Sequence, residues 1–105
     1  MTIDRVWLEP MVSDSYFPKH LVAKGQRLLA ELDARIDNER PVGEAVFALT
    51  HATTDAFNAL EEEFAEADSE IETVAREAIA ADVGFILERY GYDVDLEAAI
   101  ATRDW

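Results

Sequence analysis

The sequence contains no cysteine, and its nine Lys and Arg residues face 23 Asp and Glu residues. Without cysteine the chain can form neither a disulfide framework nor a thiolate metal site. No apolar run approaches the roughly 20 residues that a membrane span requires. The first residues also lack the basic start and apolar segment of a signal peptide. These absences predict a cytoplasmic protein.

The formal net charge of −14 is the strongest global feature of the chain. It argues against binding to nucleic acids by phosphate neutralisation and against adhesion to anionic membranes. A basic protein partner, attracted by electrostatic steering, is compatible with this charge. A compositional origin is the alternative, because frequent Ala and an excess of Arg over Lys are also typical of a GC-rich genome or a salty cytoplasm.

The fold is organised around the stretch from Ser69 to Tyr90, in which apolar residues recur at helical spacing. Ser69 and Glu72 form the pattern of a capping box at its start, and Gly91 suits the left-handed turn after its end. Its apolar surface is wide enough to require at least two neighbours. The pattern therefore predicts a central helix. Its apolar residues are Ile71, Val74, Ala75, Ala78, Ile79, Val83, Ile86, Leu87 and Tyr90.

Three further helices are predicted, at 18–40, 41–65 and 96–102, the last with Asp95 as its cap. Proline residues begin the first two of them. The apolar face of the 41–65 helix consists of Val42, Val46, Leu49, Thr53, Ala56, Phe57, Leu60 and Phe64. Residues 1–17 are predicted to be an irregular arm anchored by large apolar side chains. The whole is an all-α, single-domain bundle over residues 1–105, with three long helices, a short C-terminal helix and an N-terminal arm.

Gly25 lies on the apolar face of the 18–40 helix. A glycine inside a helix costs about 1 kcal/mol relative to alanine. Two interpretations remain open: another helix approaches closely at this position, or the glycine is a tolerated accident.

Asp82 interrupts the apolar face of the central helix. A carboxylate in a low-dielectric core must be paired, protonated, solvated or liganded. In the structural interpretation it pairs with a donor from the arm or a neighbouring helix, for which the candidates are Tyr16, Trp7, Lys24 and Thr53. In the functional interpretation Asp82 is the floor of a ligand pocket. The candidate lining residues are Tyr16, Thr53 and Tyr90.

Phe47, His51, Thr54 and Asn58 share the outer face of the 41–65 helix. His51 and Asp55 have the spacing of two metal ligands, but the chain contains neither HExxH nor the ExxH pair of ferritin-like sites. We therefore expect no metal there. Two alternatives remain: a polar outer face with one aromatic residue, or an interface of Phe47, His51 and Asn58 with a second subunit or with the arm.

An acidic cluster surrounds the turn between the second and third long helices. Carboxylates near the start of a helix are favoured by its dipole, whereas those near its end are opposed by it. A sequence selected only for helix stability would avoid the latter, so the cluster is a candidate binding surface for a basic partner. Its candidate residues are Glu61, Glu62, Glu63, Glu66, Asp68 and Glu70.

Sequence signatures of catalysis are absent. The chain has no GxSxG turn for a serine nucleophile and no Gly-rich phosphate loop. Pairs of carboxylates are of no diagnostic value among 23 acidic residues. No catalytic residue and no cofactor is predicted.

Four segments together resemble a known family: SYFPKHLVAKG, LTHATTDAFNALEEEF, SEIETVARE and YGYDVDLEAAIATRDW. The chain resembles, from about Trp7 to Trp105, a family of small acidic bacterial proteins known only as a domain of unknown function. The resemblance implies a bacterial, cytoplasmic, helical protein without an assigned activity, and it transfers no catalytic residue.

The leading functional hypothesis is therefore a non-enzymatic acidic protein that acts through protein contacts. It would be a partner or inhibitor of a basic protein, such as an immunity protein or a mimic of nucleic-acid charge. The rival hypothesis is a ligand-binding or enzymatic bundle with its pocket at Asp82. A homodimer with a housekeeping role is the third.

Overall fold

The computed structural model describes residues 5–105, and every regular element in this part of the chain is helical. The all-α prediction is confirmed. None of these helices is both long enough and apolar enough to cross a membrane. The elements in chain order are α1 (Glu9–Val12), α2 (Lys19–Glu39), the 3₁₀ helix η1 (Gly43–Ala45), α3 (Val46–Glu66), α4 (Thr73–Arg89) and α5 (Leu96–Ala99).

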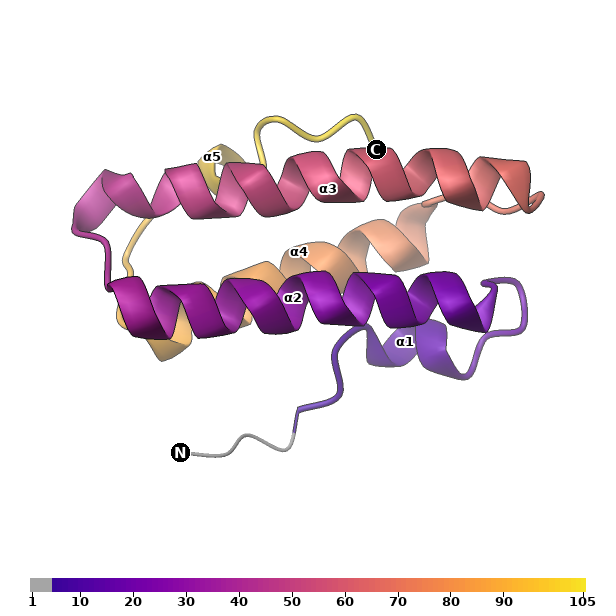
Figure 1. Cartoon of the computed structure of the whole chain (residues 1–105), viewed down its shortest axis with the longest axis horizontal. Helices are drawn as coiled ribbons and strands as arrows, with labels where there is room; N and C mark the ends of the chain where they lie inside the picture. The colour runs from indigo at the N-terminus through magenta and orange to yellow at the C-terminus, as the bar shows by residue number, and fades with distance from the viewer. Residues whose placement is uncertain (1–4) are drawn as a thin grey trace.

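Helices α2 and α3 form an antiparallel pair, which is the most extensive helix–helix contact of the bundle (Figure 1). Helix α4 lies behind this pair and runs opposite to α3. It packs against α1, α2 and α5. Residues 5–17 of the N-terminal arm lie on the α2 side of the bundle, and the C-terminal segment returns along α3 (Figure 1).

The core contains side chains from every long helix and from both terminal segments. Leu8 and Met11 of the arm are each 1% exposed, as buried as the central residues of α2 and α3. Burial of one such side chain contributes about 1.5–3 kcal/mol. The arm is therefore part of the bundle, as its large apolar residues predicted. It also contains the short helix α1, so the prediction of a wholly irregular arm was wrong.

The glycine of α2 allows close packing. A Cβ atom on Gly25 would lie 2.7 Å from Leu8 Cδ1 and 3.1 Å from Phe57 Cε1, and both of these side chains are buried. Leu8 comes from the arm and Phe57 from α3. The interpretation of Gly25 as a site of close approach is confirmed, and the arm adds a second contact to that of the helix.

The turn between α2 and α3 differs from the prediction. Arg40 ends α2 in the left-handed conformation, with φ of 43°, and Val42 is extended and 87% exposed. Gly43 also has a positive φ. Pro41 therefore interrupts the helical pattern but does not begin the next helix, and the prediction that Val42 belongs to the apolar face was wrong.

The start of α4 also differs. Ser69 and Glu72 do not form a capping box, because α4 begins at Thr73 with Glu72 as its N-cap. Ser69 is buried and its hydroxyl donates to the Tyr16 carbonyl oxygen, 3.2 Å away. Val74, predicted to be in the core, is 46% exposed. The Ser69 hydroxyl, which the sequence pattern predicted to cap α4, thus bonds to the arm instead.

The C-terminal region follows the prediction in kind but not in length. Gly91 has the expected positive φ of 79° after α4, and the Asp95 side chain accepts a hydrogen bond from the Glu97 N–H, as a cap does. Helix α5 ends at Ala99 instead of residue 102. Trp105 packs edge-to-face against Phe57, with ring centroids 6.5 Å apart.

The two helix-interior glycines should respond in opposite ways to replacement by alanine. Gly25→Ala should lower the free energy of unfolding by about 1–2 kcal/mol, because the added methyl group overpacks a filled site. Gly84→Ala should raise it by about 0.5–1 kcal/mol, because a Cβ there meets only Leu96, at 3.6 Å, and alanine favours the helix. Urea unfolding of both variants measures this difference, and the same sign for both would contradict it.

Candidate functional site

The carboxylate of Asp82 is buried and fully partnered. Its residue is 3% exposed, in the middle of α4. Oδ2 accepts a hydrogen bond from the Leu8 N–H at 2.7 Å. Oδ1 lies 2.9 Å from Arg5 Nε and 2.8 Å from Arg5 Nη2. The prediction that Asp82 is sheltered and paired is confirmed, and the pair joins α4 to the arm.

The predicted donors for Asp82 were wrong. The Tyr16 hydroxyl donates a hydrogen bond to Glu72, and Lys24 forms an ion pair with Glu63. The Trp7 backbone carbonyl accepts a hydrogen bond from the Gln26 side chain. Thr53, the fourth candidate, is buried on α3. Arg5 was missed because it precedes any periodic segment, so no sequence pattern places its side chain.

A hollow of about 410 Å³ opens beside Asp82, between the arm and α4. Neither Tyr16 nor Thr53 nor Tyr90 lines it, so the predicted composition of the pocket was wrong. The Arg5 guanidinium group, 4.2 Å from the centre of the Phe85 ring, closes one side. Because both oxygens of Asp82 already accept hydrogen bonds, the geometry makes this carboxylate an anchor for the arm. The lining consists of Arg5, Val6, Glu9, Pro10, Ser13, Ala78, Ala81 and Asp82.

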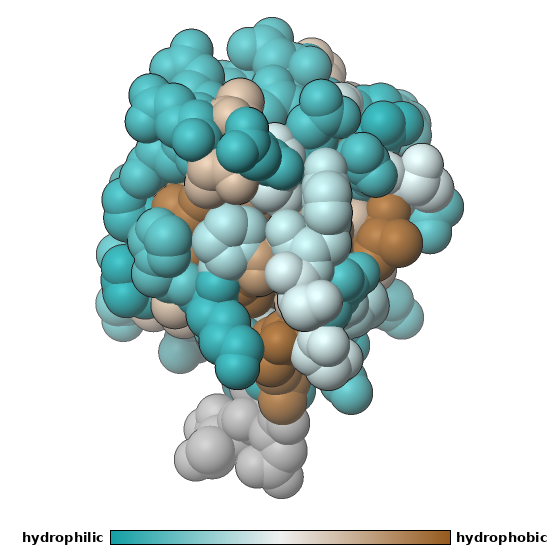
Figure 2. Space-filling view, turned by 90° about the vertical axis from the view of Figure 1, so that its right-hand side faces the viewer, coloured by the Kyte–Doolittle hydropathy of each residue, from teal (hydrophilic) through white to brown (hydrophobic). Residues whose placement is uncertain are grey.

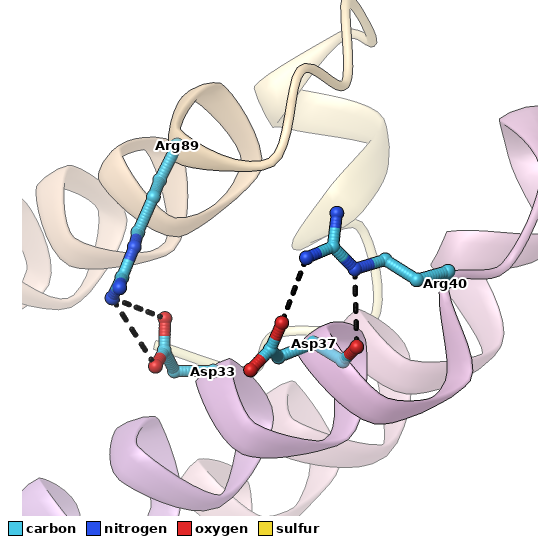
Figure 3. A network of polar contacts seen from close by, with 4 residues as sticks. All are labelled: Asp33, Asp37, Arg40 and Arg89. Atoms are coloured by element: carbon cyan, nitrogen blue, oxygen red, sulfur yellow. Dashed lines mark hydrogen bonds and ion pairs between the residues drawn. The ribbon is translucent and has the colours of Figure 1, made fainter. Parts of the chain in front are cut away.

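Tyr90 lies eight residues beyond Asp82, or about 12 Å further along α4, in a clamp between the ends of α2 and α4. Arg89 reaches Asp33 of α2, with Nη1 3.3 Å from Oδ1, and Arg40 pairs with Asp37 (Figure 3). The guanidinium carbons of Arg40 and Arg89 lie 4.9 and 5.2 Å from the centre of the Tyr90 ring.

Burial raises the pKa of the Tyr90 hydroxyl, and the neighbouring Asp33 carboxylate raises it further. The phenol therefore stays protonated through the neutral range. Tyr90 thus belongs to the contact between the two helix ends and is separate from the Asp82 hollow.

The C-terminal segment covers the outer face of α3. His51 Nε2 donates to the Ala98 carbonyl oxygen at 2.7 Å, and the His51 ring stacks on Phe47. Asn58 donates to the Thr102 carbonyl and accepts from the Asp104 N–H. The alternative in which Phe47, His51 and Asn58 contact the arm was therefore wrong, since the covering segment is the other end of the chain. The alternative of an interface with a second subunit stays a prediction.

The described residues contain no cluster of side chains that could bind a metal ion. Between residues 5 and 105, no three His, Asp or Glu side chains lie close enough to hold one ion. His51 uses Nε2 for the Ala98 carbonyl, and Asp55 points outward as an exposed residue. The expected absence of a metal or cofactor stays a prediction.

The acidic cluster at the α3–α4 turn is mostly exposed. Glu63 pairs with Lys24 across the α2–α3 contact. Burial raises the pKa of Glu61, the carboxylates of Asp104 and Glu70 raise it further, and Arg76 opposes them. Asp104, which the sequence pattern did not assign to this cluster, reaches it because the C-terminal segment folds back along α3. We call the exposed or half-exposed residues of this cluster the acidic end: Glu61, Glu62, Glu63, Glu66, Asp68, Glu70 and Asp104.

Replacement of Asp82 should show what its two acceptor oxygens contribute. Asp82→Ala should lower the free energy of unfolding by about 1–3 kcal/mol, because the buried Leu8 N–H then lacks an acceptor. Asp82→Leu should be destabilising for the same reason. Asp82→Asn retains an oxygen for Leu8 and should cost less than either. Urea unfolding measures the series, and wild-type stability of Asp82→Ala would contradict the anchoring role.

Glu61→Gln should stabilise the protein at neutral pH. A carboxyl group whose pKa is raised by folding makes the ionised folded state less stable, and this penalty disappears as the pH falls through the raised value to below the ordinary 4.5. Removal of this charge should therefore contribute about 0.2–0.5 kcal/mol at pH 7, the size of a like-charge pair on a helix, and nothing near pH 4. Thermal melts at both pH values test it, and destabilisation at pH 7 would contradict it.

Comparison with known proteins identifies a family but no characterised relative. No curated protein and no solved structure matches the chain. Residues 1–105 match a family described as a family of unknown function, DUF5713. The resemblance to an uncharacterised family is thereby confirmed, and the chain belongs to the DUF5713 family.

Proposed function

We propose that this protein is a non-enzymatic binding protein that uses the acidic end to bind a basic protein. The observation that carries the proposal is the concentration of carboxylates where helix α3 ends. The negative end of the helix dipole opposes them, and they repel one another. Burial raises the pKa of Glu61, and this crowding, through the carboxylates of Asp104 and Glu70, raises it further. Such an arrangement lowers the stability of the free protein and is relieved by a cationic partner.

The surface at this end of the bundle supports the proposal. Figure 2 shows the end at which α3 terminates and α4 begins, and its upper part is mostly hydrophilic. Among the candidate residues, Glu62, Glu66 and Glu70 are exposed and have no ion-pair partner within residues 5–105. Their charges are therefore available to a partner. Long-range attraction between such a surface and a basic protein raises the association rate and makes the binding sensitive to salt.

The rival hypothesis, a ligand-binding or enzymatic bundle with its pocket at Asp82, has one supporting observation, the hollow beside that residue. It is the weaker of the two because Arg5 and Leu8 already occupy the oxygens of Asp82. The third hypothesis, a homodimer, is disfavoured because two chains of net charge −14 repel each other.

We also propose that the protein resides in a bacterial cytoplasm.

Variants in which carboxylates are replaced by neutral amides test the acidic end against a matched control. The triple variant Glu62→Gln, Glu66→Gln and Glu70→Gln changes the net charge by three, from −14 to −11. The control triple, Glu31→Gln, Glu44→Gln and Asp55→Asn, makes the same change at exposed positions on α2, η1 and α3. Each protein is used to capture partners from a lysate of its own cells at low and high salt, and the recovered protein is then titrated with each variant.

The expected result is one basic protein that binds the wild type and the control triple with affinities within about twofold of each other. Its affinity for the acidic-end triple should fall about tenfold or more, which corresponds to 1.4 kcal/mol. An equal loss of affinity in both triple variants would show that binding depends on net charge and not on the acidic end, which would contradict the proposal. Recovery of a partner that is not basic, or that binds the acidic-end triple unchanged, would overturn the proposal.

A further inference from the structure

A hollow on the described surface lies at the other end of α4 from the acidic end. It has a volume of about 500 Å³ and lies where α4, the following turn and the start of α5 meet. That volume falls within the range of small-molecule sites, roughly 300–1,000 Å³. Leu87, Val94 and Leu96 supply apolar surface, and Tyr92 supplies an aromatic ring. The remaining lining residues are Gly84, Glu88, Gly91 and Asp93.

Gly84 is a wall residue of this hollow that packing does not require. It lies in the interior of α4, where glycine disfavours the helix relative to alanine. A Cβ at this position would meet only the Leu96 side chain, at 3.6 and 3.9 Å, which is ordinary contact. Gly25, by contrast, is required by the close approach of Leu8 and Phe57. What the absence of a side chain at Gly84 does provide is open space in the hollow.

The position of Tyr92 is held by the rest of the fold. Its hydroxyl donates a hydrogen bond to the Pro41 carbonyl oxygen in the turn between α2 and η1. Gly91, with its positive φ, places the chain for this turn. The aromatic wall is therefore preorganised, which reduces the entropy lost when a ligand binds.

The rim of the hollow carries charge of one sign. The carboxylates of Glu88 and Asp93 are exposed, and neither forms an ion pair or hydrogen bond with another residue between 5 and 105. No Lys or Arg of the described part of the chain lines the hollow. An apolar floor, an aromatic wall and two unpaired carboxylates are complementary to an ammonium group carried on an apolar body.

We propose that this hollow binds a small organic cation, an alkyl or arylalkyl ammonium ion, with its apolar body against Leu87, Val94 and Leu96 and its charge beside Glu88 and Asp93. This site is separate from the acidic end, so the proposal stands or fails independently of the function proposed above. The space left by Gly84 would then be occupied by the ligand.

Titration with n-hexylammonium, followed by the backbone amide resonances of the ¹⁵N-labelled protein, tests the site. 1-Hexanol is the neutral probe of the same shape, and a short peptide containing one lysine is the macromolecular alternative. Saturable shifts should appear at Gly84, Gly91 and Tyr92 with hexylammonium, with a dissociation constant of about 1 mM or lower. They should be much weaker with hexanol and with the peptide.

Three variants separate shape from charge. Gly84→Leu should fill the hollow and abolish the shifts, whereas Gly84→Ala should leave most of the binding. The double variant Glu88→Gln and Asp93→Asn should weaken hexylammonium binding roughly three- to tenfold, as expected for two exposed charge contacts. The control double variant Glu31→Gln and Asp55→Asn, with the same net charge, should bind like the wild type.

Several outcomes would overturn the proposal. One is equal binding of hexanol and hexylammonium, which would show an apolar dent without selectivity for charge. Another is tighter binding of the lysine peptide, which would make the hollow a protein-docking surface. Shifts confined to the acidic end, or retained in Gly84→Leu while that variant shows a wild-type melting transition, would show that the cation binds elsewhere.

Discussion

The rest of the structure depends on the contact between Asp82 and the N-terminal arm. The carboxylate in the middle of α4 accepts from the Leu8 N–H and from Arg5, which fixes the arm across the bundle. Leu8 adopts a left-handed conformation, with φ of 56°. Its side chain lies over Gly25 of α2 and its backbone faces α4. One residue of the arm thus joins two long helices that share few other direct contacts.

Burial of charge and packing of apolar groups reinforce each other at this contact. A lone buried carboxylate would be very unfavourable, whereas a carboxylate with a backbone donor and a guanidinium group is tolerated. The arm supplies both groups, and its Leu8 and Met11 side chains are buried in the core. The apolar side chains bring the donors to Asp82, and Asp82 in turn selects this one placement of the arm.

The two ends of the molecule have different surfaces. At the α3–α4 turn, carboxylates are crowded against the unfavourable end of a helix dipole, and the returning C-terminal segment adds Asp104 to them. At the other end, the clamp of Arg89 on Asp33 holds α4 against α2 (Figure 3). Beside it lies the hollow whose wall contains Gly84. The surface proposed for a basic protein and the hollow proposed for a small cation are both consistent with an acidic molecule.

The sequence alone determined the features that depend on periodicity and on single-residue chemistry. Helical spacing predicted the long helices, and the apolar surroundings of Asp82 predicted its burial. Gly91 predicted the turn after α4, and Asp95 predicted the cap of α5. Only the tertiary structure decided what those features contact. Ser69 bonds the arm instead of capping α4, Arg5 pairs with Asp82, and the C-terminal segment covers His51 and Asn58. These partners come from the two terminal segments, far away in the chain, where no long periodic pattern predicts the direction of the chain. Their positions therefore follow only from the packing of the whole bundle.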